Sequence, residues 1–535
     1  EPKKTDILYR NIDENQRRLL ESYRRTSGVM NYVRLINGAF STKPTSEWEE
    51  PDHIPWQAIM GREGNIYETY DEFMEAEGHR DWPSIAVYFY RDEWIMGDIY
   101  YQQALFEEIY KHGYNPIIFY GQYGSNPRVG IPNMKLSMNY LFGKDQFPFD
   151  VLINTCKFSY QSLGAQTLEE LKLQDVPIIQ GYTIYMDEKT WAADPQGVTP
   201  LDVNLSISQP ELDGVIQGGV VACQTFDERG HYVYLPVKER IAAIVERAIK
   251  WSKLRHIPVS ERKVAIILHN YPPKNSNIGS AAGLDTPESV RRLLQVMQDE
   301  GYTVDTVPET SAELMDIVTS HMTNDRSMLT DELLASAEGR LSSADYKAYF
   351  ETLPADTQKS MIESWGAAPG DVFVYDDEII IPGFSNGNLW ITVQPPRGFG
   401  ENVSAIYHDP CLPPPHQYLA FYHWVRNVFE ADAVIHVGTH GSLEWLPGKG
   451  AGLSASCYPE IGISSLPNIY PYWTTIIGEG IQAKRRSSAC LVGHLSPPMT
   501  TAGLYDEFEE LEALLDEHSH FEQEHPESVS DIENV

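Results

Sequence analysis

Basic residues are scarce in this sequence of 535 residues. Lysine and arginine together number 41, against 76 aspartates and glutamates, which gives a formal net charge of −35. Proteins that bind nucleic acid in general need a broad basic surface, so this composition excludes that class. A polyanionic substrate would need a local basic pocket to overcome the overall negative field.

Cysteines are also few, and they lie far apart. The five are Cys156, Cys223, Cys411, Cys457 and Cys490, an odd number with no CxxC pair. This usage argues against a disulfide framework and against a structural zinc site made of thiolates. It favours a reducing compartment, and we expect a cytoplasmic protein.

Long apolar runs are missing too. No stretch approaches the roughly 20 apolar residues of a membrane helix. The first residues, EPKKTDILYR, lack the apolar core of a signal peptide. The sequence therefore predicts no membrane span.

Two common catalytic motifs are absent. The pattern GxxxxGK[ST] does not occur, so the sequence predicts no ATP site of that kind. HExxH is absent as well, and no Ser/His/Asp arrangement stands out, which disfavours a zinc hydrolase.

What the sequence does contain is enough apolar residue, 42% of the chain, for a sizeable core. Short apolar runs alternate with segments of helical periodicity, and this alternation is typical of parallel β-sheets flanked by helices. The runs lie at 85–90, 116–120, 150–154, 176–180, 264–269 and 433–438. We predict an α/β fold made of several parallel-sheet units with helical insertions.

The same patterns divide the chain into four parts. We expect a helical and loop lead-in over 1–80, a first α/β domain over 81–260, and a second over 261–500 with a helical insertion at 311–370. Residues 501–535 contain twelve acids and no Lys or Arg, which predicts an acidic helix followed by a frayed tail. No internal sequence repeat is evident.

One helix has clear terminal signals. Asp285 or Thr286 can cap it, Pro287 suits its first turn, and Gly301 can end it.

Unusual loops follow two of the predicted strands. In open α/β sheets, ligands bind beyond the carboxyl ends of the strands. One loop begins at His269, and the other runs from His436 to Lys449. In the second loop His440 and Glu444 are four residues apart, so a helix capped by Thr439 would place them on one face. Such a pair could share a metal or relay a proton, or Glu444 could simply cap the helix start.

Histidines are dense nearby. Of sixteen in the chain, five fall between 408 and 440: His408, His416, His423, His436 and His440. Imidazole suits cobalt, nickel and zinc, whereas oxygen-only sites suit magnesium. His423 lies in the aromatic run FYHWVRNVF, which favours packing on a helix. His436 lies within an apolar strand and fits either a core residue or a ligand.

Three basic features could meet an anionic substrate. The glycine-rich segment Gly448–Gly452, which contains Lys449, resembles a phosphate cradle. Lys484, Arg485 and Arg486 could bind carboxylates, or they could form a solvated helix face. Arg397 follows the stiff Gln394-Pro395-Pro396 segment, which could hold a pocket wall in place.

Several blocks of the sequence resemble a known family. They include HVGTHGSLEWLPGKGAGLS, GEGIQAKRRSSACLVGHLSPPMT, LHNYPPKNSNIGSAAGLDTPESV, TVQPPRGFGENVSAIYHDPCLPPPHQYLAFYHW, FYRDEWIMGD and PELDGVIQGG. Spread over roughly residues 60–515, they are similar to the large chain of cobaltochelatase and to the H-type chain of magnesium chelatase. EWLPGK is closer to the cobalt branch than to the EFMPGK form of the magnesium branch.

The resemblance implies a tetrapyrrole-binding subunit that inserts a metal. It implies cobalt insertion into a corrin precursor of the hydrogenobyrinic acid a,c-diamide type, in cobalamin biosynthesis. Insertion of magnesium into protoporphyrin IX and a non-catalytic tetrapyrrole carrier are the alternatives. Cobalt is the favoured metal substrate, with magnesium or nickel open. Separate AAA+ ATPase-type subunits would hydrolyse ATP. Family members run further past the PPMT segment, so a second chain could supply the remaining part.

Each candidate residue then has an expected role. Glu444 is the base or metal-facing carboxylate and His440 the transient metal ligand, with His436 and His269 as further ligands. His408 and Asp409 are third candidates for the base or ligand. The residues expected to meet the substrate are Arg397, His408, Trp445, Lys449, Lys484, Arg485 and Arg486.

Overall fold

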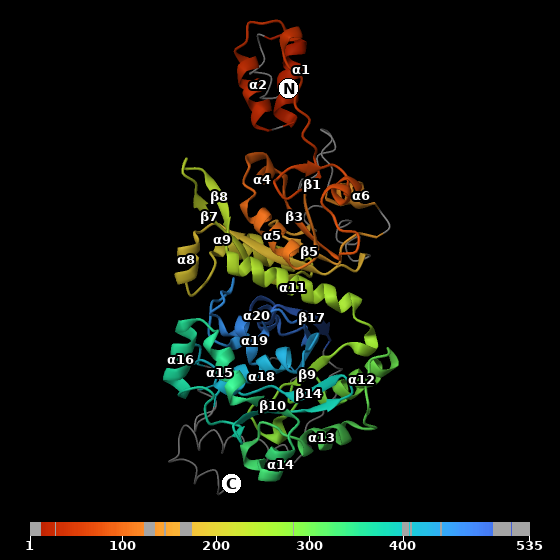
Figure 1. The fold of residues 1–535 in the computed structure, drawn as a ribbon, viewed down its shortest axis with the longest axis vertical. Helices are drawn as coiled ribbons and strands as arrows, with labels where there is room; N and C mark the ends of the chain where they lie inside the picture. The colour runs from red at the N-terminus through yellow and green to blue at the C-terminus, as the bar shows by residue number, and fades with distance from the viewer. Residues whose placement is uncertain are drawn as a thin grey trace.

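The computed structural model describes residues 12–26, 28–121, 134–143, 146–160, 174–281, 283–398, 406, 409–438, 441–495 and 515. A helical hairpin stands at one end, followed by two α/β units (Figure 1). The long helix α11 (Lys238–His256) lies between these units. Within the described residues, no helix is both long and apolar enough to cross a membrane. The α/β fold class is confirmed.

The hairpin consists of α1 (Glu14–Thr26) and α2 (Val29–Ala39). Leu19, Leu20 and Tyr23 form its small core. It projects from the rest of the molecule (Figure 1).

The first unit contains an eight-stranded sheet with the order β2-β1-β4-β3-β5-β6-β7-β8. The five middle strands, from β4 to β7 in this order, are parallel, and β1, β2 and β8 join them antiparallel at the edges. The strands are β1 (Ala58–Met60), β2 (Ile66–Tyr67), β3 (Ser84–Tyr90), β4 (Asn115–Gly121), β5 (Val151–Asn154), β6 (Ile178–Ile184), β7 (Ile216–Phe226) and β8 (Tyr232–Pro236).

This sheet begins earlier in the chain than the sequence pattern indicated. β1 and β2 fall inside the lead-in expected over 1–80, yet β1 pairs with β4 and β2 pairs with β1, so they extend the sheet. They are two or three residues long, too short to give a recognisable alternation. The helices of this unit are α3 (Tyr70–Ala76), α4 (Arg91–Met96), α5 (Tyr100–Lys111), α6 (Met134–Phe142), α8 (Glu188–Ala193), α9 (Pro200–Asp202), a π-helical turn (Val203–Ser208) and α10 (Gln209–Glu211).

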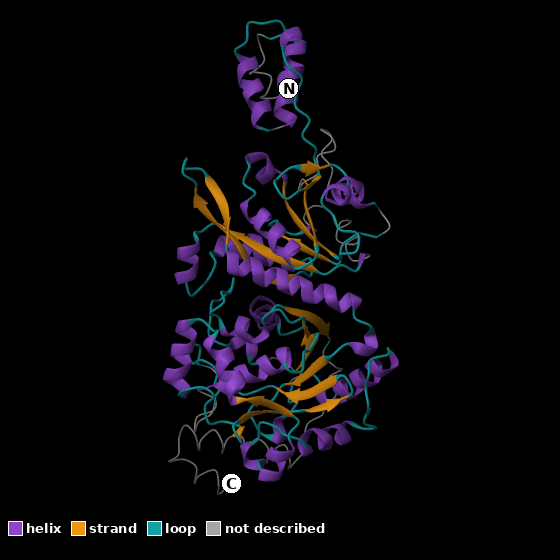
Figure 2. Ribbon diagram, in the orientation of Figure 1, coloured by secondary structure: helices purple, strands orange, loops and turns teal. Residues whose placement is uncertain are grey.

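The second unit contains a six-stranded sheet, β13-β14-β9-β15-β16-β17, and a small sheet, β10-β12-β11. Helices cover both faces of the larger sheet (Figure 2). The strands are β9 (Val264–Leu268), β10 (Gly339–Ser342), β11 (Val374–Tyr375), β12 (Glu378–Ile381), β13 (Phe384–Asn386), β14 (Leu389–Val393), β15 (Ala433–Val437), β16 (Asn468–Trp473) and β17 (Ala489–His494).

The region 311–370 is mainly helical, with β10 as its strand. The helices of the second unit are α12 (Thr286–Asp299), α13 (Ser311–Ser320), α14 (Asp331–Ser336), α15 (Ser343–Glu351), α16 (Ala355–Trp365), α18 (His416–Asn427), α19 (Tyr458–Ile463) and α20 (Ile477–Ser487). The signals read for α12 are confirmed, since the Asp285 side chain accepts a hydrogen bond from the Glu288 amide. Short 3₁₀ turns lie at Thr45–Glu47, Val259–Glu261, Asn275–Asn277, Arg326–Met328 and Leu443–Trp445.

The α-helix expected after β15 is not present in the described residues. The segment holding Glu444 is a single 3₁₀ turn, Leu443–Trp445. Leu446 is extended, with ψ 155°, as expected of a residue that precedes a proline. Pro447 therefore stops the helix that the four-residue spacing of His440 and Glu444 had predicted. The acidic tail with its histidines, apart from residue 515, lies outside the described residues.

Candidate functional site

The parallel strands of both sheets have the same order. Numbered along the chain within each unit, they run 2-1-3-4-5, because the chain places its second parallel strand on one side of the first and its third on the other. In open α/β sheets, ligands bind at this reversal, outside the carboxyl ends of the strands. In the second unit the reversal lies at β9 and β15, which His269 and the 438–449 segment follow.

Glu444 lies at this carboxyl edge and is only 1% exposed. Its Oε1 accepts a hydrogen bond from the Gly441 amide at 3.0 Å. A Cβ atom on Gly441 would lie 3.2 Å from Glu444 Oε2 and 3.0 Å from Gln394 Nε2. The carboxylate therefore lies beside an amide side chain in a polar setting. A carboxylate shielded from water in this way can accept a proton or face a cation.

Hydrogen bonds fix the residues around Glu444. Gln394, which follows β14, accepts from the Ser442 amide at 2.9 Å and donates to the Tyr422 hydroxyl at 3.2 Å. The Ser442 and Tyr418 hydroxyls are 2.9 Å apart. Because Tyr418 and Tyr422 belong to α18, this network ties the Glu444 turn to a core helix. Burial raises the pKa of both tyrosines, so their hydroxyls stay neutral.

His436 belongs to the same network. Its Nε2 lies 3.0 Å from the Tyr422 hydroxyl and its Nδ1 lies 2.8 Å from Asn468 Oδ1. Burial lowers its pKa to about 4. Both ring nitrogens are hydrogen-bonded inside the core, as is typical of a structural residue, and a role for His436 as a metal ligand stays a prediction.

The other predicted ligands are only partly placed. His269 is buried at the end of β9, where its amide donates to the Val437 carbonyl at 2.9 Å. His440 and His408 lie outside the described residues. Among the residues that are described, no group of three or more His, Cys, Asp or Glu side chains could hold a metal.

Lys449 and its glycines do not form a phosphate cradle. Its Nζ donates to three carbonyls of the first unit, those of Trp191, Ala192 and Asp194, at 2.7 to 3.0 Å. The amides of the two residues that follow Lys449 donate to carbonyls at positions 195 and 196. The segment that resembled a phosphate cradle forms a contact between the two units. The expected role of Lys449 in substrate binding stays a prediction.

The basic cluster at the end of α20 also has protein partners. Arg486 donates to the carbonyls of Glu444, Leu446 and Lys449 at 2.7 to 3.1 Å. Arg485 forms an ion pair with Glu211 at 2.7 Å.

Lys484 donates to the Glu211 carbonyl at 3.4 Å. Burial lowers its pKa. The cluster is therefore neither a solvated face nor, in this arrangement, a clamp for substrate carboxylates.

The remaining candidates have mixed settings. Arg397 is buried and donates to the Asp409 carbonyl at 2.7 Å. Asp409 in turn accepts from the amides of Cys411 and Leu412, so its carboxylate caps a turn. Trp445 is half-buried in the Glu444 turn.

The packing role expected for His423 is confirmed. Its ring stacks on Tyr349 with centroids 3.9 Å apart, and Asn427 donates to its Nδ1. His416 is buried likewise, with the Tyr346 hydroxyl 3.0 Å from its Nδ1.

Sequence patterns did not indicate the neutral members of the network: Gln394, Tyr418, Tyr422, Ser442 and Asn468. A weak signal was present for one of them, because Gln394 directly follows an apolar run, as His269 does. Tyr418 and Tyr422 are four residues apart in an aromatic helix, where core packing is the usual reason for such spacing.

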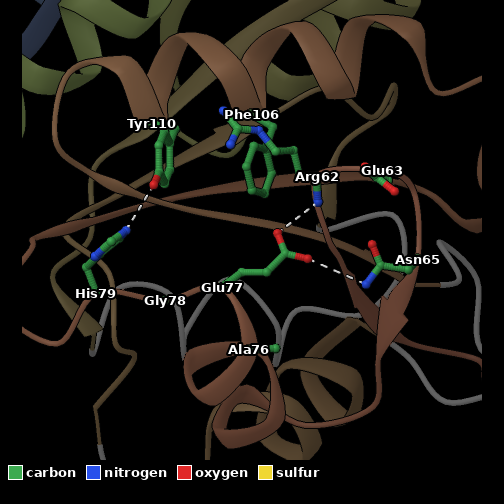
Figure 3. A pocket seen from close by; sticks show the side chains of 9 residues that line it. All are labelled: Arg62, Glu63, Asn65, Ala76, Glu77, Gly78, His79, Phe106 and Tyr110. Atoms are coloured by element: carbon green, nitrogen blue, oxygen red, sulfur yellow. Dashed lines mark hydrogen bonds between the residues drawn. The ribbon is translucent and has the colours of Figure 1, made fainter.

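A separate hollow of about 590 Å³ lies on the first unit (Figure 3). Several of its polar groups already have partners, because Arg62 forms an ion pair with Glu107 and its backbone amide donates to Glu77. His79 contacts the Tyr110 hydroxyl at 3.1 Å. Because these polar side chains already bond to one another, we consider the hollow a weaker candidate site than the sheet edge at Glu444.

Comparison with known proteins places these observations in a family. Residues 21–534 match the family CobN/Magnesium Chelatase. The chain is 33% identical over 479 residues to the aerobic cobaltochelatase protein CobN of Pseudomonas aeruginosa, which covers 88% of the chain and 37% of that protein. It is 30% identical over 454 residues to the H-type chain of magnesium chelatase from Rhodobacter capsulatus, which covers 81% of the chain and 36% of that protein.

Two further relatives are similar over almost the whole chain. An uncharacterized protein of Methanocaldococcus jannaschii is 39% identical over 95% of the chain and 42% of its own length. The structure of the catalytic subunit of cobaltochelatase from Mycobacterium tuberculosis matches with a TM-score of 0.74 and 32% identity, over 99% of the chain and 44% of that subunit. The chain thus spans about two fifths of the length of these relatives.

Proposed function

Since the chain belongs to the CobN/magnesium chelatase family, we propose that it is the metal-inserting part of a chelatase subunit. It binds a tetrapyrrole and takes part in placing a divalent metal in the ring. The observation that carries the proposal is the buried carboxylate of Glu444 beside Gln394, at the sheet reversal where α/β proteins bind ligands.

The favoured substrates are cobalt and a corrin precursor of the hydrogenobyrinic acid a,c-diamide type, as in cobalamin biosynthesis. Support comes from the EWLPGK form of the motif and from the similarity to cobaltochelatase proteins. Magnesium with protoporphyrin IX is the alternative, because the H-type chain of magnesium chelatase is similar over 81% of this chain. Nickel stays open as a third metal.

Insertion of a divalent metal requires the loss of two pyrrolic protons and of the water bound to the metal. We assign the base to Glu444, whose Oε1 is held by the Gly441 amide. This hydrogen bond orients the acid, so that little reorganisation accompanies proton transfer. His440, four residues before Glu444, remains the proposed transient metal ligand, and His269 lies at the end of the adjacent strand.

ATP hydrolysis is assigned to separate AAA+ ATPase-type subunits, since the sequence lacks GxxxxGK[ST]. Because the relatives are more than twice as long, a second chain or a further segment could supply the rest of the substrate cavity. Five cysteines, all of them free thiols, fit the cytoplasmic location we propose.

The test is a Glu444→Gln variant in an assay reconstituted with ATPase subunits. We expect tetrapyrrole binding, followed by absorbance, to be unchanged, and metal insertion to fall at least about a hundredfold because the base is lost. Glu332→Gln, an exposed acid on α14, is the matched control and should insert metal normally. Unimpaired insertion by Glu444→Gln would remove Glu444 from this role.

A non-catalytic tetrapyrrole carrier is the second candidate function. Titration with each macrocycle and each of Co²⁺, Mg²⁺ and Ni²⁺ separates the two. Turnover with ATPase subunits supports the chelatase, whereas binding without turnover supports the carrier.

A further inference from the structure

The helix α2 leaves one apolar face uncovered. Four side chains form a stripe along it, and they are 65%, 41%, 59% and 85% exposed, in the order Val29, Val33, Ile36 and Phe40. They are four, three and four residues apart, a spacing that puts side chains on the same side of a helix. Leu35, on the opposite side, packs against the core of the hairpin. The helix is therefore apolar on two sides, and α1 covers one of them.

A helix that is apolar on opposite sides is normally buried. The hairpin core has three buried members, Leu19, Leu20 and Tyr23, fewer than the four exposed side chains of the stripe. Met30, beside the stripe, is exposed as well, and with Val33 it lines a hollow of about 270 Å³. A contiguous exposed apolar surface of this kind marks a site of protein–protein interaction.

The charge of the chain indicates which partner fits. α2 contains no acidic residue and one basic residue, Arg34, which pairs with Glu49 and Asp52 of its own chain at 2.7 Å. The chain as a whole has a net charge of −35, so two copies would repel each other over most of their surface. The uncharged stripe avoids this repulsion. Because the hairpin projects from the rest of the molecule (Figure 1), two hairpins can meet while the acidic bodies stay apart.

The stripe is also complementary to itself. Its spacing of four, three and four residues reads the same in both directions along the helix. A two-fold axis across the middle of α2 would place Val33 against Ile36 of a second copy, and Val29 against Phe40. A surface that pairs with its own copy in this way forms an isologous interface, the commonest kind in homodimers.

A hollow at one end of the stripe matches the side chain at the other end. It has a volume of about 1140 Å³, and its apolar lining consists of Val29, Met96, Tyr100, Phe226, Tyr232 and Leu235. Phe40 lies about 16 Å from Val29 along the helix. The same two-fold axis therefore brings the exposed ring of Phe40 in each copy to the hollow of the other.

Two acidic side chains also line this hollow, but they already have partners. Asp98 accepts a hydrogen bond from the Tyr234 amide at 3.0 Å. Asp227 accepts from the amides of Arg229 and His231, within its own turn. The aromatic and aliphatic side chains thus form a surface that suits an apolar occupant such as a phenyl ring.

We infer that α2 is the interface of a symmetric dimer, in which the α2 helices of two copies pack antiparallel and Phe40 of each enters the hollow at Val29 of the other. Each α2 then lies between its own α1 and the second α2, so both of its apolar sides are covered. This inference goes beyond the proposed function and does not rest on metal insertion.

The first test is sedimentation velocity of the purified full chain over a range of concentrations. At about 0.15 M salt, where repulsion is screened beyond about 8 Å, wild type should sediment at twice the mass of one chain. Val33→Asp should raise the dissociation constant at least about tenfold, since like charges then meet inside an apolar interface. Val296→Asp, which changes an exposed valine on α12, is the control and should dimerise as wild type does.

These measurements can contradict the inference in two ways. Wild type that stays monomeric at every concentration would show that the stripe serves a different partner. A dimer that a folded Val33→Asp variant leaves unchanged would show that copies meet at another surface.

A second test examines the contact between Phe40 and the hollow. Phe40→Cys and Met96→Cys are made separately in a Cys411→Ser background, because Cys411 is an exposed thiol. After the two variants are mixed and oxidised gently, a disulfide-linked dimer should form at least about tenfold faster than in either variant alone, because only the mixture brings the two thiols together. A dimer that forms no such link in the mixture would overturn the antiparallel arrangement.

Discussion

At the scale of single residues, Glu444 and His436 lie in one network but serve different ends. Glu444 keeps an ionisable oxygen beside Gln394, and the missing side chain at Gly441 makes room for both. The Glu444 carboxylate accepts a hydrogen bond from the Gly441 amide, whereas both ring nitrogens of His436 are used inside the core.

His436 predicts a pH effect on stability. In the unfolded chain a histidine takes up a proton as the pH falls through its ordinary value near 6.5, whereas folded His436 stays neutral until about pH 4. The unfolded state then binds more protons, so stability is present above pH 6.5 and is lost as the pH falls. Between about pH 7 and about pH 5 the loss from this residue should be about 2 kcal/mol.

Denaturant unfolding of His436→Gln at both pH values measures this loss. The variant should show a smaller pH dependence than wild type by that amount. His231→Gln, an exposed histidine of the β7–β8 turn, should retain the wild-type dependence. If the unfolding free energy changed with pH by the same amount in wild type and in His436→Gln, the result would contradict a neutral, buried imidazole.

At the scale of elements, local patterns predicted most of what local forces determine. Fully buried strands such as β3 and β4 appear as apolar runs because both their faces are covered. The capping residue of α12 was also predicted, because a helix cap depends on residues that are close in sequence. The partners of charged side chains were not, since Arg485 and Glu211 are 274 positions apart and only the tertiary fold brings them together.

Arg486, at the end of α20, also has partners that lie far away in the sequence. The guanidinium group of Arg486 donates from three separate nitrogens to three carbonyls of the Glu444 segment, an arrangement that the single nitrogen of a lysine at this position does not reproduce. Arg486→Lys should lower the kcat of metal insertion more than it changes KM, and should cost about 1–3 kcal/mol of stability. The measurements are insertion kinetics and denaturant unfolding.

Arg292→Gln, an exposed arginine on α12, is the control and should change stability by less than about 1 kcal/mol. Arg486→Gln should be more impaired than Arg486→Lys if the hydrogen bonds matter. Normal insertion by both variants would show that the turn keeps its place without this arginine.

At the scale of the whole molecule, a buried ion cluster joins the two units. Glu460 on α19 accepts from Arg240 at 2.9 Å and from Arg247 at 3.1 Å, and both arginines belong to α11. Burial alone would raise the pKa of Glu460, but the two guanidinium groups lower it overall. The cluster lies where α11 faces the second unit (Figure 1).

Glu460→Gln should therefore destabilise the protein by about 3–5 kcal/mol, because two buried guanidinium groups lose their counter-ion. Calorimetry should show this as a lower transition temperature, with the two units separating into distinct transitions. Glu430→Gln, which removes an exposed ion pair with Lys263, should cost less than about 1 kcal/mol. A single unshifted transition for Glu460→Gln would contradict the role of this cluster in joining the units.

The segment from Glu444 to Lys449 is fastened at both ends to different bodies. Lys449 is bonded to the backbone around α8 of the first unit, and Arg486 of the second unit grips the carbonyl of Glu444 itself. Because Arg486 also donates to the Lys449 carbonyl, both units hold the same short segment. A displacement of α8 relative to the second unit would therefore strain the backbone that carries Glu444.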